Sequence, residues 1–273
     1  MSSELQATND TDDCATSIWS VILEEIRLEQ DREPLLSEFF QARIVGRSCL
    51  EDALAFGLSQ RLANGALAFD RLREIFDAAY ADDPALAQAA CRDLHAVRER
   101  DPATERLSDA LLYFKGFHAL QGHRVAHWLW RQDRQSIALF LQSQVSVLFG
   151  VDIHPAATLG HGILFDHATS IVVGETAVID DDVSILHEVT LGGTGKAVGQ
   201  RHPKIRRGVL IGAGAKLLGD IEVGEFAKIG AGSVVLNDVP NRTTVAGIPA
   251  VAIGKTDGSL PAREMDHRLP AMP

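Results

Sequence analysis

Up to about residue 150, apolar residues recur along the chain at helical spacing. The segments "SIWSVILEEIRLEQ" and "DRLREIFDAAYADDP" mix apolar and acidic positions as an amphipathic helix does, and the second stops at a proline. In "LLYFKGFHALQGHRVAHWLW", apolar side chains recur at every third position, at Leu111, Phe114, Phe117 and Leu120. Asp83 and Asp101 each precede a proline and are typical of helix starts. The pattern predicts an all-α helical domain over residues 17–150, preceded by a disordered tail over residues 1–16.

The period changes to six at Ile153. From there large apolar residues occupy one register position of the repeat, with two extra residues between Phe165 and Val173. These residues are Ile153, Leu159, Phe165, Val173, Ile179, Ile185, Leu191, Ile205, Ile211, Leu217, Val223, Ile229 and Val235. Neither an α-helix nor an ordinary strand repeats at six, whereas a β-helix of hexapeptides does, with one short strand and one corner per repeat. The pattern therefore predicts an α+β fold, with a parallel β-helix over residues 151–255 and a flexible tail over residues 256–273.

One long loop insertion interrupts the repeat, "GGTGKAVGQRHPKI" between Leu191 and Ile205. Insertions in a solenoid collect on one face and often serve binding. No Asp or Glu occurs from residue 189 to residue 219, but this stretch contains Lys196, Arg201, Lys204, Arg206, Arg207 and Lys216. In a chain of net charge −11, this asymmetry indicates a polyanionic small ligand or a carboxylate substrate, with a solvated loop as the alternative.

Composition narrows the class of protein. A net charge of −11 argues against a general nucleic-acid-binding protein, which needs clustered Lys and Arg. Cys14, Cys49 and Cys91 lie far apart and match no metal-ligand spacing, which indicates a reducing compartment. The most apolar run, "IALFLQSQVSVLFGV", is interrupted by two Gln and two Ser, and the N-terminus lacks the pattern of a signal peptide. We therefore expect a cytoplasmic protein that binds neither nucleic acid nor membrane.

The stretch "FDHATS" places Asp166 and His167 directly after the inward-facing Phe165. His167 then faces outward and contributes nothing to the aliphatic core. Asp152, in "VDIHPAA", precedes it by close to one coil, and neighbouring coils lie about 4.8 Å apart, so its carboxylate can orient the imidazole as a general base. The alternatives are an ordinary surface histidine and an aspartate that caps a turn at the domain junction.

Two further pairs of residues share a register position at the spacing of three hexapeptides. Ala213 and Ala231 lie three hexapeptides apart in the same register, so they stack directly if one coil consists of three hexapeptides. Two stacked small residues would leave a smooth groove suited to an extended thread such as pantetheine; the alternative is that small residues simply suit tight corners. His187 follows His167 by three hexapeptides once the two-residue slip is removed. We expect the two rings to stack, and a second imidazole there would disfavour protonation of His167.

The chain resembles the serine O-acetyltransferases of cysteine biosynthesis, a family of hexapeptide-repeat acyltransferases, from about residue 17 to residue 255. The resemblance rests on "RERDPA", "LLYFKGFHALQ", "HWLW", "VDIHPAA", "DHATSIVVGETAVI", "VTLGGTGK", "RHPKI", "GVLIGAGAKLLG" and "AKIGAGSVVL". It implies a left-handed β-helix with three hexapeptides per coil. It also implies a homotrimer with CoA between neighbours, or a dimer of trimers joined through the helical domains.

The resemblance further implies an activity. Acetyl would pass directly from acetyl-CoA to the hydroxyl of L-serine, giving O-acetyl-L-serine and CoA, with feedback inhibition by L-cysteine and without a metal. His167 would be the general base and Asp152 its partner. The amino acid would be bound by Asp101, Asp166, Arg201 and His202. The cosubstrate would be contacted by Gly193, Thr194, Ala213 and Ala231. A histidine with an ordinary pKa near 6.5 suits proton removal from a hydroxyl at neutral pH.

Two departures from the family affect expected contacts. Val251 stands where the family often has Arg after "IPA", which removes an expected contact to the CoA nucleotide. The chain ends in Pro273 rather than the terminal Ile that enters the active site of O-acetylserine sulfhydrylase, so we do not expect that partnership in its usual form.

Three other functions stay open. An acetyltransferase for a sugar hydroxyl shares the repeat but not the "DPA" and "YFKGFHALQ" segments. A zinc hydratase would draw its ligands from His154, His161, His167, His187 and His202. A scaffold without catalysis is the third alternative, against which the outward Asp-His pair argues.

Overall fold

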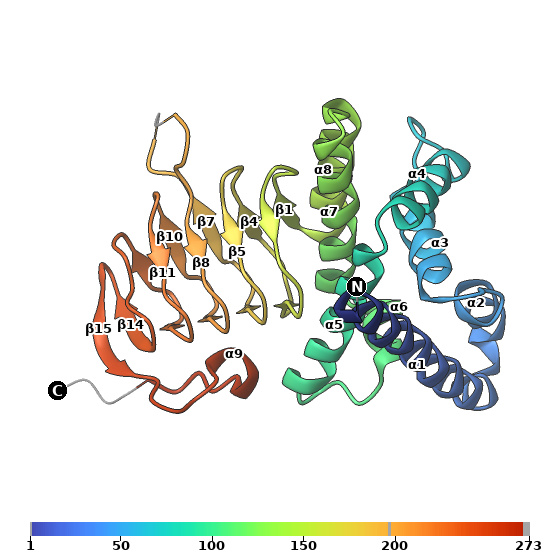
Figure 1. The fold of residues 1–273 in the computed structure, drawn as a ribbon, viewed down its shortest axis with the longest axis horizontal. Helices are drawn as coiled ribbons and strands as arrows, with labels where there is room; N and C mark the ends of the chain where they lie inside the picture. The colour runs from blue at the N-terminus through green and yellow to red at the C-terminus, as the bar shows by residue number, and fades with distance from the viewer. Residues whose placement is uncertain (1, 196–197, 270–273) are drawn as a thin grey trace.

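The computed structural model describes residues 2–195 and 198–269, with side chains from residue 15 onward. Helices form the first half of the chain and a parallel β-helix forms the second (Figure 1). The coils of the β-helix follow one another away from the helices, so the last coil is farthest from them (Figure 1). The predicted fold class, an all-α domain followed by a hexapeptide β-helix with one loop insertion, is confirmed.

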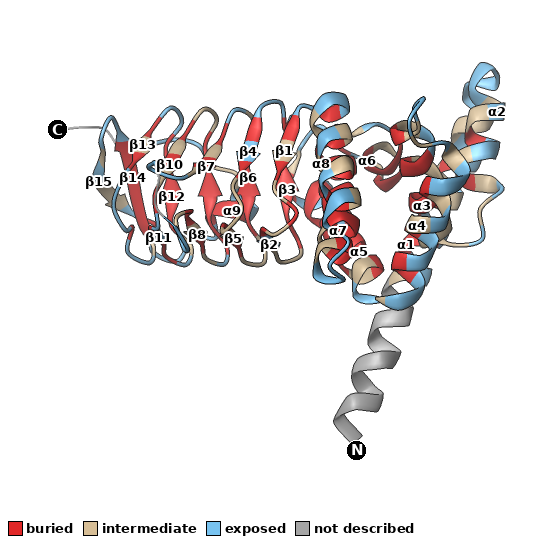
Figure 2. Cartoon of the chain, turned by 90° about the horizontal axis from the view of Figure 1, so that it is seen from above, coloured by how far each residue is buried: buried red, intermediate tan, exposed pale blue. Residues whose placement is uncertain are grey.

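The helical part buries the inward face of each amphipathic helix (Figure 2). Its elements are α1 (Ser2–Arg32), the 3-10 helix η1 (Pro34–Leu36), α2 (Ser37–Phe40), the π-helix η2 (Gln41–Val45), α3 (Leu50–Leu62), α4 (Phe69–Asp82), α5 (Ala85–Arg100), α6 (Leu107–Tyr113), α7 (Lys115–Arg131) and α8 (Gln135–Phe149). Helix α7 is buried along almost its whole length, so it is the centre of this part. The structure begins α1 at Ser2, within the segment for which the sequence predicts a disordered tail.

One local prediction in this part is wrong, and one stretch of helical spacing is divided between two helices. The apolar stretch around Phe114 is not one helix, because Phe114 is extended (φ −84°, ψ 109°) and separates α6 from α7. Asp101 does not start a helix. It caps the C-terminal end of α5, and its carboxylate accepts hydrogen bonds from Ala103 N at 2.9 Å and Thr104 Oγ1 at 2.8 Å. At Phe114 tertiary packing overrides local propensity, because the first turn of α7 packs against the β-helix.

The β-helix consists of three parallel sheets, to which successive coils contribute one short strand each. Its strands are β1 (Val151–Ile153), β2 (Thr158–Leu159), β3 (Leu164–Phe165), β4 (Ile171–Val173), β5 (Val178–Ile179), β6 (Ser184–Ile185), β7 (Thr190–Gly192), β8 (Lys204–Ile205), β9 (Leu210–Ile211), β10 (Lys216–Leu218), β11 (Glu222–Val223), β12 (Lys228–Ile229), β13 (Val234–Val235), β14 (Thr243–Gly247) and β15 (Ala250–Lys255). Sheet A has the order β1-β4-β7-β10-β13, sheet B β2-β5-β8-β11 and sheet C β3-β6-β9-β12-β14-β15. An A–B corner follows each strand of sheet A, and a C–A corner precedes each of the later ones.

The predicted apolar register is the register of the core. Ile211 pairs with Ile229, three hexapeptides later, which is the regular coil. The earlier slip lengthens the first coil by two residues, where Ile153 pairs with Val173. Across the insertion Leu191 pairs with Leu217, so the insertion adds eight residues to one coil. The aliphatic residues of this register are buried in the axial stack, apart from the half-buried Leu159.

A buried polar network joins the helical part to the first coil. Asp93 of α5 is fully buried and accepts hydrogen bonds from Gln121 Nε2 at 2.9 Å, Arg124 Nη2 at 2.7 Å and Ile163 N at 2.9 Å. Arg124 also donates to Gly160 O at 2.8 Å. Because Gly160 and Ile163 flank a corner of the β-helix, this carboxylate and guanidinium tie α5 and α7 to the first coil.

The last segment returns along the β-helix. Strand β14 pairs with β15 in an antiparallel hairpin, and the short helix α9 (Pro261–Glu264) follows. Ser184 Oγ donates to Ala262 O at 2.7 Å, and Thr256 Oγ1 donates to Phe226 O at 2.6 Å. The structure thus places residues 256–264 against the coils, in the stretch for which the sequence predicts a flexible tail.

The structure bears on two expectations drawn from composition. Among the residues it describes, no helix is both long and apolar enough to span a membrane. Cys49 and Cys91 are not joined in a disulfide, and the Cys14 side chain lies outside the described residues. The cytoplasmic location stays a prediction.

Candidate active site

Asp166 and His167 lie at the first C–A corner, between β3 and β4. Phe165 before them points into the core and pairs with Ile185 of the next coil. His167 has a left-handed backbone, with φ of 54°, and its carbonyl accepts a hydrogen bond from Thr169 N at 2.7 Å. This tight turn directs the imidazole away from the core, as the register predicts, and leaves the side chain 77% exposed.

A continuous column of C–A corners leads away from His167 along the axis of the β-helix. Backbone hydrogen bonds join successive corners, from Glu188 N to Thr169 O at 2.7 Å, from Gly214 N to His187 O at 3.0 Å and from Gly232 N to Ala213 O at 2.8 Å. Ala213 is half-buried and Ala231 is exposed, and the two stack in register as predicted. The column therefore runs from an exposed imidazole to a surface of small residues.

His187 lies beside His167 at the next corner of this column. The two ring centroids are 6.0 Å apart with an interplanar angle of 75°, which confirms the predicted proximity of the rings in an edge-on arrangement. His187 Nδ1 is buried and has no hydrogen-bond partner among the described residues. Its effect on the protonation of His167 stays a prediction.

Asp152 opens the coil that the His167 corner closes. It lies in β1 opposite Val172 of β4, and two residues before it Gly150 O accepts a hydrogen bond from Ser170 N at 2.7 Å. Asp152 and the His167 corner are thus neighbours in space. Asp152 Oδ1 accepts a hydrogen bond from Gln142 Nε2 of α8 at 2.6 Å, whereas the carboxylate beside His167 Nε2 is that of Asp166, at 3.8 Å. The pairing of Asp152 with His167 stays a prediction.

Arg201 and His202 follow the long loop, at an A–B corner. His202 is buried against Gly174, and its Nδ1 lies 2.9 Å from Thr176 Oγ1. Burial, followed by repulsion from Arg201, lowers the pKa of His202, so this ring is neutral at physiological pH. The Arg201 guanidinium pairs with Glu175, and this hydrogen bond lowers the pKa of the Glu175 carboxyl.

The candidate residues of the β-helix lie at two edges of sheet A. The C–A corners carry Asp166, His167, Ala213 and Ala231, and the A–B corners carry Gly193, Thr194, Arg201 and His202. The long loop projects at the A–B edge (Figure 1). Since a strand of sheet A separates the two edges, one chain does not bring the two sets together. Asp101 lies outside the β-helix, at the end of α5.

Carboxylates from neighbouring coils balance most of the basic residues of the insertion region. Arg201 pairs with Glu175, Lys204 with Asp220, Arg206 with Asp180 and Glu222, and Arg207 with Asp182. Lys216 of sheet A instead donates to the backbone carbonyl of Glu188. Lys196 lies outside the described residues. The charge asymmetry seen along the sequence is therefore largely neutralised in space, and Lys216 is the better candidate to meet an anion.

Sequence reasoning missed three residues that hold the candidate side chains. Glu175 and Thr176 fix Arg201 and His202 from the preceding coil, and the repeat register alone does not single them out. Gln142 interrupts the most apolar run of the chain, and in the sequence this interruption indicates only that the run does not span a membrane.

Comparison with known proteins decides the family. Residues 18–122 match the family described as "Serine acetyltransferase, N-terminal", and residues 202–237 match "Bacterial transferase hexapeptide (six repeats)". The serine acetyltransferase of Escherichia coli strain K12 is 56% identical over 252 residues, which cover 92% of this chain and 92% of the relative. The chain belongs to the serine acetyltransferase family. It is therefore an acyltransferase, and the resemblance seen in its motifs is confirmed.

Solved serine acetyltransferases share the whole architecture. One described as a complex with cysteine aligns with a TM-score of 0.92 at 53% identity, covering 94% of this chain and 100% of that chain. The enzyme from Brucella abortus strain S19 in complex with coenzyme A gives 0.87 at 52% identity, covering 88% and 96%. The soybean enzyme complexed with serine gives 0.87 at 54% identity, covering 88% and 99%.

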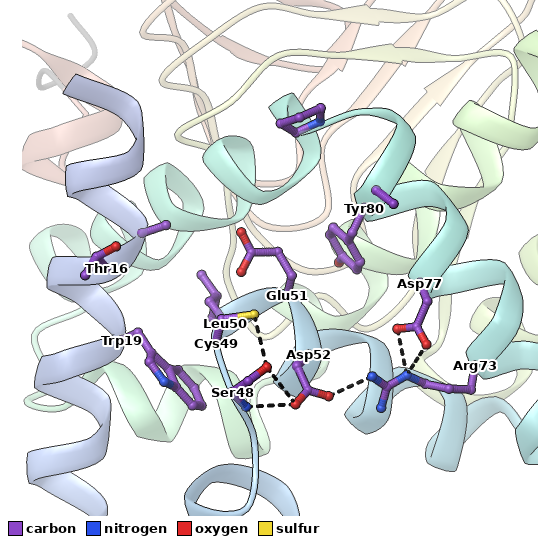
Figure 3. A pocket seen from close by; sticks show the side chains of 13 residues that line it. Thr16, Trp19, Ser48, Cys49, Leu50, Glu51, Asp52, Arg73, Asp77 and Tyr80 are labelled. Atoms are coloured by element: carbon purple, nitrogen blue, oxygen red, sulfur yellow. Dashed lines mark hydrogen bonds and ion pairs between the residues drawn. The ribbon is translucent and has the colours of Figure 1, made fainter. Parts of the chain in front are cut away.

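The helical part of this chain contains a cavity of about 780 Å³ between α1, α3 and α4 (Figure 3). Its Arg73 donates hydrogen bonds to Asp52 at 2.7 Å and to Asp77 at 2.7 Å. Because this guanidinium is already bound by two carboxylates, the cavity offers little to the phosphates of coenzyme A.

The zinc alternative draws on histidines that the fold distributes over different corners. His154 and His202 lie at A–B corners, His161 at the corner between sheets B and C, and His167 and His187 at C–A corners. Among the described residues, no group of three His, Cys, Asp or Glu side chains is arranged to hold a metal ion.

Proposed function

We propose that this chain transfers the acetyl group of acetyl-CoA directly to the hydroxyl of L-serine, with His167 as the general base. The observation that carries the proposal is the column of C–A corners. It places an exposed imidazole, turned out of an otherwise aliphatic coil, in line with the small residues Ala213 and Ala231. An extended pantetheine arm lying along those residues would bring its thioester toward His167.

The chemistry needs one base and no covalent enzyme intermediate. His167 takes the proton of the serine hydroxyl while Oγ attacks the thioester carbon. The tetrahedral intermediate collapses, the C–S bond breaks, and the imidazolium returns the proton to the departing CoA sulfur. Asp152 orients the imidazole and stabilises its protonated form, as a carboxylate does in a catalytic triad. O-acetyl-L-serine and CoA leave.

The serine carboxylate and ammonium groups require the other candidate residues. Arg201 and His202 recognise the carboxylate, and Asp101 and Asp166 the ammonium group. Because the two edges of sheet A do not meet within one chain, we infer that the A–B edge of one copy faces the C–A edge of its neighbour in a homotrimer. The outer face of sheet A is partly exposed and includes Val172, an apolar residue that is 39% exposed, which is consistent with such packing. The helical parts then join two trimers.

The ligands of the relatives extend the proposal. Because related enzymes are described in complex with cysteine, coenzyme A and serine, we expect all three to bind this chain. L-Cysteine differs from L-serine by one atom and competes for the same carboxylate and ammonium contacts, which gives feedback inhibition. Val251, which is exposed, has no charge with which to contact the phosphates of the CoA nucleotide, so we expect that contact to be missing here.

The test is a CoA-release assay with acetyl-CoA and L-serine, supported by the mass of the assembly. We expect His167→Ala to reduce kcat by at least about a hundredfold, since positioned general bases contribute on that order. The matched control is His95→Ala, at an exposed histidine of α5 outside both edges, which should retain full activity. Full turnover by His167→Ala would refute the proposed base.

Mixing two inactive variants tests the site between copies. His167→Ala disables the C–A edge, and Arg201→Ala disables the A–B edge. When the two variants are refolded together, some sites combine the intact A–B edge of one variant with the intact C–A edge of the other. With random assembly, about a quarter of the sites (one half times one half) become complete. Recovery of about a quarter of the wild-type rate supports a shared site, and no recovery contradicts it.

A further inference from the structure

The helical hairpin formed by α7 and α8 contacts Asp152 and the corner that carries His167. Helix α8 ends at Phe149, and Gly150, in a left-handed conformation with φ of 69°, turns the chain directly into β1. From α8, Gln142 Nε2 donates a hydrogen bond of 2.6 Å to Asp152 Oδ1. The carboxylate that the β-helix presents at its first strand is therefore held by an amide from the helical domain.

The partner helix of this hairpin, α7, begins against the corner that carries His167. Lys115 Nζ donates to Thr169 Oγ1 of that corner. Gly116 lies so close that an added Cβ would overlap Phe165 O and would lie 3.0 Å from the Ala168 side chain. The glycine is required here for close approach rather than for backbone freedom, because it is helical. The His167 corner thus rests on the first turn of α7.

We propose that the α7–α8 hairpin positions the acid–base pair and that Gln142 is a positioning residue for Asp152. This inference rests on the proposed roles of His167 and Asp152. A carboxylate on a strand surface can rotate about its side-chain bonds, and a hydrogen-bond donor on one oxygen removes that freedom. The other oxygen, Oδ2, is left to meet the imidazole. The helical domain then contributes to catalysis besides assembly.

The alternative is that Gln142 serves only the stability of the helical domain. The chain offers a comparison two residues further along the same helix. Gln144 Oε1 accepts a hydrogen bond from Asn64 Nδ2 at 2.8 Å, so this amide bonds within the helical domain and not to the β-helix. A purely structural role predicts similar effects of the two glutamines, whereas positioning predicts that only Gln142 affects the chemical step.

The test compares Gln142→Leu with the matched control Gln144→Leu in the full-length enzyme, after circular dichroism and mass measurement have established the fold and assembly. We expect Gln142→Leu to lower kcat by about tenfold to a hundredfold, because misplacement of a catalytic group by about 1 Å has effects of that order. The KM values for L-serine and acetyl-CoA should stay within about twofold of the wild type. Gln142→Glu, which keeps the shape but removes the donor, guards against a packing effect and should lose as much.

Two readouts separate positioning from stability. In Gln142→Leu the acidic limb of the pH profile of kcat/KM should move to lower pH, because a poorly oriented carboxylate stabilises the imidazolium less. Asp166 and His187, which also face His167, are unchanged in this variant. In the Asp152→Asn background, Gln142→Leu should have no further effect on kcat, since both act through the same carboxylate.

The outcomes distinguish this inference from the proposed function. Full activity of Gln142→Leu, or a loss of kcat that adds in full to that of Asp152→Asn, overturns the positioning role even when His167→Ala and Asp152→Asn each have a strongly reduced but measurable kcat. Full activity of His167→Ala or Asp152→Asn overturns the proposed function itself. Equal losses in Gln142→Leu and Gln144→Leu, with an unmoved pH profile, assign both glutamines to stability alone.

Discussion

Replacing Asp93 by Asn tests how the helical domain is attached to the β-helix. The substitution preserves the size of the side chain and removes its charge. Asp93 is 0% exposed, and its partner Arg124 is 7% exposed and 2.7 Å away. The variant would leave a guanidinium buried without its counter-charge, and its amide nitrogen would replace an oxygen that accepts hydrogen bonds from neighbouring N–H groups. Removing one partner of a buried ion pair costs about 3–5 kcal/mol.

The assay is thermal and urea unfolding followed by circular dichroism, at fixed protein concentration because the protein is expected to be oligomeric. For a domain of this size, about 1 kcal/mol shifts the Tm by roughly 2–4 °C, so we expect a decrease of at least about 6 °C. The double variant Asp93→Asn, Arg124→Met, which removes both charges, should be more stable than Asp93→Asn alone. Glu74→Gln, at an ion pair with both side chains more than 60% exposed, is the control and should cost below about 1 kcal/mol.

Two results would refute this reasoning about Asp93. One is a free energy of unfolding of Asp93→Asn within about 1 kcal/mol of that of the wild type. The ion pair between Asp93 and Arg124 would then contribute almost nothing to stability. The other is a double variant as unstable as the sum of the single changes, because the two residues would then act independently.

Two shorter predictions concern pH and the A–B corner. Burial, together with repulsion from Arg61, lowers the pKa of His118 to about 3. The folded state therefore favours the neutral form of His118. The contribution of this ring to the free energy of unfolding is complete above the unfolded pKa of about 6.5, and the free energy of unfolding falls by about 1.4 kcal/mol per pH unit below that pKa. His118→Phe should therefore reduce the slope of unfolding free energy against pH between pH 4 and 6 by about one proton, and an unchanged slope would disprove the assignment. Gly174→Ala places a methyl group in the space of the His202 ring and should raise the KM for L-serine by about tenfold or more. The control is Gly65→Ala, at a glycine with open space around it, and this variant should leave the KM unchanged. Equal KM values in the two variants would show that His202 does not contact the substrate.

The repeat region was largely predictable because its signal is local. Each large aliphatic residue packs into the same axial core, so the period of six by itself predicts which side chains point inward. Ile211 and Ile229 are examples. The outward orientation of His167 follows from the same register. In the helical part the prediction was coarser. The periodicity around Phe114 continued through a break that exists because α7 starts against the β-helix, and Asp101 capped a helix end instead of a helix start.

Charge along the sequence was a poor guide to charge in space. The insertion region contains no acidic residue, yet Arg201, Arg206 and Arg207 meet carboxylates that lie 16 to 26 residues away along the chain. Coils of a β-helix stack residues of distant sequence positions, and the pairing depends on the length of every intervening corner. Gln142 shows the same limit, since only the path of α8 into β1 brings its amide to Asp152.

By itself, the sequence determined the two-part organisation, the axial register and the chemical types of the candidate side chains. These depend on periodicity and residue identity, which are properties of neighbouring positions. The tertiary structure alone decided which residues meet. It set the two candidate groups at separate edges of sheet A, supplied counter-charges to the basic loop and placed one helical hairpin against both Asp152 and the His167 corner. The physical reason is that contacts between distant segments depend on corner lengths and helix docking, which no local pattern encodes.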